Sequence, residues 1–120
     1  MPTSRIKLGN WGDGLARRML QGKGYAILTT NYQSQRGEID IVAQEGAKLV
    51  LVEVRTRSGF GTPEESVSQA KVRRLVATAQ DYMQSLGDDL VSWRIDLVSV
   101  RAAGNGNLQS IDHLKHAVQL

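Results

Sequence analysis

The segment from Lys48 to Arg57 constrains the fold more than any other part of this chain. Successive side chains of a β-strand point to opposite faces of the sheet. Within residues 49–55 the even-numbered positions are all valine, and the odd-numbered positions are two leucines followed by Glu53 and Arg55. A strand that begins apolar on both faces is typical of the centre of a sheet. We therefore expect a central strand that carries Glu53 and Arg55 into a cleft at its C-terminal end.

The hydrophobic pattern predicts the order helix, three strands, helix, strand and a tail. The expected helices cover residues 10–22 and an apolar stripe from Val72 to Leu86, and the tail is expected to be helical from about Asp112. The expected strands cover residues 25–32, 38–43, 48–57 and 93–101. A helix between the third and fourth strands predicts a mixed sheet flanked by helices. A chain of 120 residues is enough for a single α/β domain over residues 1–120.

Composition excludes several kinds of chemistry. The chain has no cysteine, which rules out disulfides, thiolate zinc sites and cysteine nucleophiles. Its apolar runs are too short to span a bilayer, and its N-terminal residues lack the apolar stretch of a secretory signal. We expect a cytoplasmic protein with no membrane partner.

The positive charge is concentrated in one half of the chain. Residues 1–60 hold nine Lys and Arg against five Asp and Glu, whereas residues 61–120 hold six against seven. A basic half is compatible with a nucleic-acid partner, although many enzymes without such a partner are equally basic.

Carboxylates gather where two predicted strands meet. Strand alternation places Glu38 and Asp40 on one face, with Ile39 and Ile41 on the other. A short turn at residues 44–47 brings Asp40 opposite or nearly opposite Glu53. Like charges facing each other destabilise a sheet, and a bound cation removes the conflict. Carboxylate oxygens suit magnesium, which can polarise a phosphodiester and activate a water molecule. The alternative is a cross-strand ion-pair network of Asp40, Glu53 and Arg55 that holds no ligand.

Two motifs resemble a known family. The run Gly37-Glu38-Ile39-Asp40-Ile41-Val42-Ala43, followed by Leu51-Val52-Glu53-Val54-Arg55-Thr56-Arg57, resembles the YraN family of small bacterial proteins. The resemblance runs nearly end to end and includes Gly12-Asp13, Lys71-Val72-Arg73-Arg74-Leu75, Arg94-Ile95-Asp96 and Ile111-Asp112-His113-Leu114. It implies the restriction-endonuclease-like fold of the PD-(D/E)XK superfamily and a similarity to archaeal Holliday junction resolvases.

The resemblance implies a metal-dependent endonuclease acting on branched or otherwise structured DNA. By position, Asp40 and Glu53 would hold Mg²⁺ or Mn²⁺, and Glu38 would orient groups from the edge of the site. Asp13 stands where the superfamily often has a glutamate on its first helix, so its side chain is one methylene shorter. A homodimer is expected by analogy with the resolvases.

Arg55 departs from the superfamily pattern because it occupies the position of the motif lysine. Arginine stays protonated and cannot act as a general base, but it can clamp a phosphate and stabilise transition-state charge. Lys71 flanks the apolar stripe of the second predicted helix and could supply the missing ammonium, unless it is only a solvated helix lysine. The candidate contacts to a phosphate backbone are Arg17, Arg18, Arg57, Lys71, Arg73 and Arg74.

Two other functions remain open at this point. The chain could be a nucleic-acid-binding protein that keeps the nuclease fold but has lost cleavage through Arg55. It could also be an interaction protein whose carboxylate–arginine cluster is purely structural. His113 and His116, spaced three residues apart in the expected tail helix, are a weaker candidate for metal binding.

Overall fold

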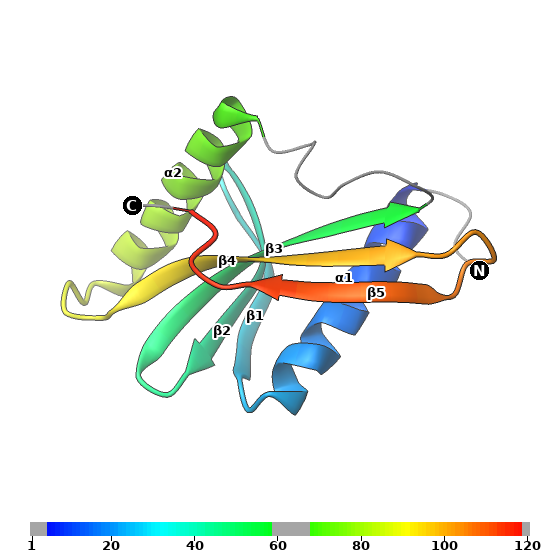
Figure 1. The fold of residues 1–120 in the computed structure, drawn as a ribbon. Coiled ribbons are helices and arrows are strands. Elements are labelled where there is room, and N and C mark those ends of the chain that lie inside the picture. Colours follow the sequence, from blue (N-terminus) through cyan, green and yellow to red (C-terminus); the bar gives the residue numbers. More distant parts are fainter. Residues whose placement is uncertain (1–4, 59–67, 119–120) are drawn as a thin grey trace.

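The computed structural model describes residues 5–58 and 68–118, and the side chains from Leu8 onward. Within these residues two helices and five strands follow one another along the chain (Figure 1). They are α1 (Arg5–Gly22), β1 (Ala26–Ser34), β2 (Gly37–Glu45), β3 (Lys48–Ser58), α2 (Gln69–Leu86), β4 (Trp93–Ala102) and β5 (Leu108–Leu114). Neither helix is long and apolar enough, over the described residues, to cross a membrane.

The strands form one mixed sheet in the order β1-β2-β3-β4-β5. Strands β1, β2 and β3 are antiparallel neighbours, β3 and β4 are parallel, and β5 runs antiparallel to β4. The parallel pair needs a crossover connection, which α2 supplies. The prediction of a mixed sheet with β3 at its centre is confirmed.

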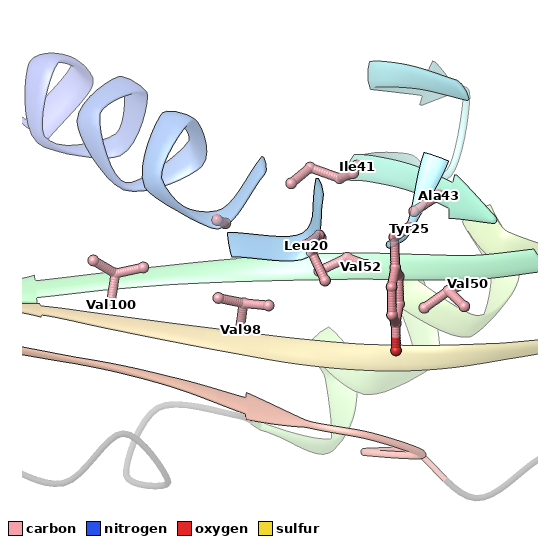
Figure 2. Close-up of a cluster of buried hydrophobic side chains, with 9 residues drawn as sticks. Leu20, Tyr25, Ile41, Ala43, Val50, Val52, Val98 and Val100 are labelled. Carbon is pink, nitrogen blue, oxygen red and sulfur yellow. The ribbon is translucent and has the colours of Figure 1, made fainter. Parts of the chain in front are cut away.

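Helix α1 covers one face of the sheet. Its Ala16 and Leu20 are fully buried against residues of β2, β3 and β4 (Figure 2). Val50 and Val52 belong to this cluster and Val54 packs against it, so the valine face of β3 lies beneath α1. The uniformly apolar face predicted from the sequence is therefore the α1 side.

Helix α2 covers the opposite face (Figure 1). Leu49 and Leu51 of β3 pack there with Ala79 and Leu75 of the helix. The helix begins at an N-cap, Ser68, whose hydroxyl accepts a hydrogen bond from the Lys71 amide, and it ends at Gly87 in the left-handed conformation. Because Glu53 and Arg55 follow Leu49 and Leu51 on the same strand face, these charges lie on the α2 side.

The expected tail helix is wrong. Residues 108–114 form β5, which pairs with β4 from Leu97↔Leu114 to Ala102↔Leu108. The loop at residues 104–107 is thus the turn of a hairpin, and the free edge of β4 supplies a backbone pairing that a short isolated helix would lack. Helix α1 also begins earlier than expected, at Arg5 instead of Asn10.

The expected alternation along β2 is also wrong at one point. Ile41 is buried on the α1 side, but Ile39 packs with the α2-side cluster instead of sharing its face. The residue between them is Asp40, and the pairing of β2 with β3 reaches only to Ile41↔Val52. Beyond that pair the ladder no longer holds β2 flat against β3, so strict alternation is not imposed.

Candidate functional site

The candidate site lies where β2 and β3 separate. The next pair of the ladder would be Asp40 and Glu53, in agreement with the predicted register, but the pairing ends at Ile41↔Val52. In place of a backbone pair at this position, the Oδ2 atom of Asp40 accepts a hydrogen bond from the Val54 amide at 2.7 Å. Asp40 is therefore held in the opening between the two strands.

Glu53 shares a hydrogen bond with Asp40 and is half-buried. Burial raises the pKa of Glu53 well above its usual range, and the hydrogen bond and charge of Asp40 raise it further. The positive charges of Lys71 and Arg55 act in the opposite direction and do not cancel the shift. Two carboxyl groups this close share a proton unless a cation takes its place.

Asp13 reaches the same carboxylates from α1. Burial and the nearby charge of Asp40 raise the pKa of Asp13 to about 6, although Arg17 opposes the shift. Asp13 and Asp40 line a cavity of about 250 Å³ on the α1 side, together with Val54 and Thr56. A carboxyl group with a pKa near 6 can take up or release a proton close to neutral pH.

Gly12 makes this position of α1 possible. A Cβ atom built on Gly12 would collide with the Oγ1 atom of Thr56 on β3. Without a side chain at residue 12, the helix lies close enough to β3 for Asp13 to face Asp40. In the Gly12-Asp13 pair noted in the sequence, Gly12 thus allows α1 to approach β3 closely, and Asp13 supplies a carboxylate there.

Lys71 lies with the carboxylates on the α2 side. A cavity of about 340 Å³ is lined there by Glu38, Asp40, Glu53, Lys71 and Arg74, among others. Lys71 is close enough to Glu53 to lower its pKa through charge. Glu38 is exposed at the edge of this cavity, near Gln33 of β1.

Arg55 is placed differently from Lys71. Its side chain is 8% exposed and lines a neighbouring, mainly aliphatic cavity of about 260 Å³ between α2 and β4. The Nη1 atom is buried and has no hydrogen-bond partner among the residues that the structure describes. Burial and the nearby Arg57 lower the pKa of the Arg55 guanidinium. Within the described chain, no ion pair joins Arg55 to Asp40 or Glu53, so the ligand-free network considered above does not form there.

The candidate phosphate contacts do not gather on one face. Arg17 and Arg18 lie on α1, whereas Lys71, Arg73 and Arg74 lie in the first turns of α2, on the opposite side of the sheet (Figure 1). Arg57 lies near the end of β3 and close to Arg55. The α2 group borders the carboxylate cavity through Lys71 and Arg74, and Arg17 approaches the site through Asp13.

A second buried polar cluster was not predicted as a unit. Asp96 on β4 is fully buried and accepts hydrogen bonds from Arg94 Nε at 2.9 Å and from the His116 amide at 3.0 Å. His113 Nε2 lies 2.7 Å from Asp96 Oδ2, and its Nδ1 lies 3.0 Å from Lys23 Nζ. Because an ammonium only donates, Nδ1 accepts from Lys23 and Nε2 donates to Asp96.

These contacts show how the two histidines that were candidates for metal binding are used. His113 is engaged with Asp96 and Lys23, while His116 contributes its backbone amide to Asp96. Across residues 5–58 and 68–118, no three His, Asp or Glu side chains form a metal-holding group. The sequence signal for the cluster was the charged pair Arg94 and Asp96, two residues apart on an apolar strand.

The Asp40–Glu53 pair fits a hard divalent cation. Magnesium is usually bound by one or two carboxylates and completes its coordination with water and substrate phosphates. Burial, together with the hydrogen bond and charge of Asp40, raises the pKa of Glu53, so the pair needs compensating positive charge when both groups are ionised. Mg²⁺ or Mn²⁺ between these oxygens would supply that compensation.

Comparison with known proteins identifies the family. The model of the family described as "Uncharacterised protein family UPF0102" matches residues 12–100. The chain belongs to the UPF0102 family. A UPF0102 protein of Roseiflexus castenholzii is 40% identical over 124 residues, covering 99% of this chain and 98% of the relative. UPF0102 proteins of Dehalococcoides mccartyi and Symbiobacterium thermophilum are 45% and 41% identical, covering 83% and 86% of this chain and 84% and 89% of the relatives.

The UPF0102 family is the YraN family, so the resemblance seen in the sequence is confirmed. The matched range contains Asp13, Asp40, Glu53, Arg55 and Lys71. It also contains Arg94 and Asp96 but ends before β5. The candidate site therefore lies wholly within the part of the chain that the UPF0102 model describes.

Proposed function

We propose that this UPF0102 protein is a metal-dependent endonuclease that hydrolyses phosphodiester bonds in branched or otherwise structured DNA. The observation that carries the proposal is the Asp40–Glu53 pair, two interacting carboxyl groups held where β2 and β3 separate. A restriction-endonuclease-like fold is part of the same proposal. It is supported by the mixed sheet, the helix on each face and the carboxylates on adjacent central strands.

The residues of the site divide the chemistry between them. Asp40 and Glu53 would hold Mg²⁺ or Mn²⁺, which supplies a Lewis acid for the phosphodiester and lowers the pKa of a bound water. Lys71 shares the cavity with these carboxylates, and its ammonium stabilises the negative charge that develops on the phosphate. Asp13, with its pKa raised to about 6, would act as an auxiliary acid that donates a proton to the leaving oxygen of the phosphodiester.

The role of Arg55 distinguishes this proposal from its closest competitor. The guanidinium stays charged and lies beside the carboxylate pair, so it can hold DNA but cannot remove a proton from water. Lys71 lies in the carboxylate cavity and offers the ammonium that Arg55 lacks. The competing function is a DNA-binding protein without cleavage, and it is favoured only if Lys71 does not serve in this way.

A cleavage assay tests the proposal. Branched, single-stranded and duplex DNA would be incubated with Mg²⁺ or Mn²⁺ and with the wild type, Asp40→Asn, Glu53→Gln or Lys71→Met. We expect the wild type to cut branched DNA, and each variant to lose about a hundredfold or more in rate. Asp89→Asn, an exposed acid in the α2–β4 connection, is the matched control and should cut normally.

Two results would decide against this function. If the wild type cuts nothing while Arg55→Lys does, the chain is a binding protein that has lost cleavage. If cutting survives both carboxylate substitutions, the site is elsewhere. Thermal unfolding gives a readout independent of activity: Mn²⁺ should raise the Tm of the wild type and not that of Asp40→Asn.

A further inference from the structure

A mainly aliphatic cavity adjoins the carboxylate pair. It has a volume of about 260 Å³ and is lined by Val72 and Leu75 of α2, Leu97 of β4 and Leu114 of β5. Glu53, Lys71 and Leu75 line both this cavity and the polar one that holds Asp40, so the two spaces meet at these side chains. A ligand bound at the carboxylates can therefore extend into an apolar chamber.

Arg55 gives this chamber a specific polar group. The side chain is more than nine-tenths buried and lines the chamber, and its Nη1 atom has no acceptor among the described residues. A buried donor without a partner destabilises the folded protein. Two carboxyl groups line the chamber, but Asp96 is engaged with Arg94, His113 and the His116 amide, and Glu53 forms no ion pair with Arg55. An acceptor brought in by a ligand would remove this cost.

The ligand must combine an apolar body with a hydrogen-bond acceptor and must be joined to a phosphodiester. A nucleobase meets these requirements, since each of the four bases carries carbonyl or ring-nitrogen acceptors on a flat body. The volume is below the range of about 300–1,000 Å³ typical of drug-sized ligand pockets, which favours a single base over a longer segment. A base inside a duplex is stacked and paired, so it must leave the stack to enter such a chamber.

We infer that the aliphatic cavity beside Glu53 receives the base of an unpaired nucleotide, and that Arg55 donates a hydrogen bond to it. This inference rests on the proposed nuclease function and specifies its substrate as DNA with an unpaired nucleotide next to the bond that is cut. The basic side chains at the start of α2 hold the flanking phosphates, and the chamber adds the preference for an unpaired base.

Binding measured without cleavage tests this inference. Fluorescence anisotropy in EDTA would compare a fully paired duplex with the same duplex carrying one unpaired nucleotide. We expect the wild type to bind the second duplex about tenfold more tightly, because the buried charged donor of Arg55 gains an acceptor. Ala117 is exposed and lines the cavity, so Ala117→Trp should fill the opening and abolish the preference.

Controls separate the cavity from general effects. Ala47→Trp places the same ring at the exposed β2–β3 turn and should keep the tenfold preference. Leu97→Trp fills the chamber from β4 and repeats the test if Ala117→Trp is poorly folded. Binding of the fully paired duplex should change less than twofold in any correctly folded variant.

The outcomes distinguish the two proposals. Equal binding of both duplexes by the wild type, or a preference that survives both cavity-filling variants, overturns the inference and leaves the nuclease function standing. Failure to bind any DNA at low salt overturns the nuclease function and the inference with it.

Discussion

The neighbouring parallel strands β3 and β4 each carry an acid and an arginine two residues apart, but the two pairs have opposite surroundings. On β4, Arg94 and Asp96 lie two residues apart and form an ion pair of 2.9 Å. On β3, Glu53 and Arg55 have the same spacing, yet no ion pair joins them. Glu53 shares a hydrogen bond with another acid, and Arg55 keeps a buried donor that no described residue accepts.

The difference lies in what surrounds each pair. Arg94 also donates to Glu45 and to the Tyr25 hydroxyl, and Asp96 accepts from His113. Buried charges with this many partners are structural, because their desolvation is offset within the protein. The β3 pair has no such set and borders two cavities. Buried ionisable groups that lack compensating partners and lie beside a cavity are typical of a functional site.

The largest expected effect comes from breaking the satisfied cluster. Asp96→Ala should lower the free energy of unfolding by about 3–5 kcal/mol, because it leaves the buried Arg94 guanidinium with an incomplete set of partners. Urea unfolding at neutral pH measures the change. A loss below about 1 kcal/mol, the range of ordinary exposed ion pairs, would show that this cluster is not a structural one.

An intermediate effect is expected from Glu53→Gln in the metal-free protein. The pKa of Glu53 is raised on folding, so the folded state binds a proton more tightly than the unfolded chain. The stability of the wild type then falls as the pH rises above the ordinary range of a glutamate, and Glu53→Gln escapes this loss. Urea unfolding should show little difference near pH 4 and an advantage of about 1–3 kcal/mol for the variant near pH 8.

Glu45→Gln gives the opposite dependence on pH. The hydrogen bond from Arg94 lowers the pKa of Glu45, so the stability from its charge is present above the ordinary glutamate pKa and is lost on acidification. This variant should be less stable than the wild type at neutral pH and equal to it in acid. The same pH dependence for both variants would contradict the contrast between the clusters.

The smallest effect is expected from Arg55→Met. The substitution removes an unpartnered buried donor and keeps an apolar side chain of similar length, so stability should stay within about 1 kcal/mol of the wild type or increase. Arg94→Met removes a partnered guanidinium and should cost several times more in the same urea experiment. A large loss from Arg55→Met would mean that Arg55 is structural.

Much of the site could be predicted from sequence because strand alternation is local. The switch from leucine to charge on β3 placed Glu53 and Arg55 on one face, and the short turn at Gly46 placed Asp40 opposite Glu53. Prediction failed where distant pairing decided the structure. The sequence Leu108–Leu114 becomes a strand because β4 offers an edge, and no local periodicity reveals that edge.

The central strand, its valine face, the two helices and the family could all be recognised from local sequence patterns. These features depend on patterns within a few residues of one another. Burial of apolar side chains favours the same local structure for such a pattern in any compact fold. Only the tertiary structure decided which charges are satisfied. The spacing of Glu53 and Arg55 equals that of Arg94 and Asp96, but Tyr25, Glu45 and His113 come from remote segments to meet one pair and not the other. Electrostatic compensation depends on distance in space, so the arrangement of charge at the candidate site became visible only when the chain was folded.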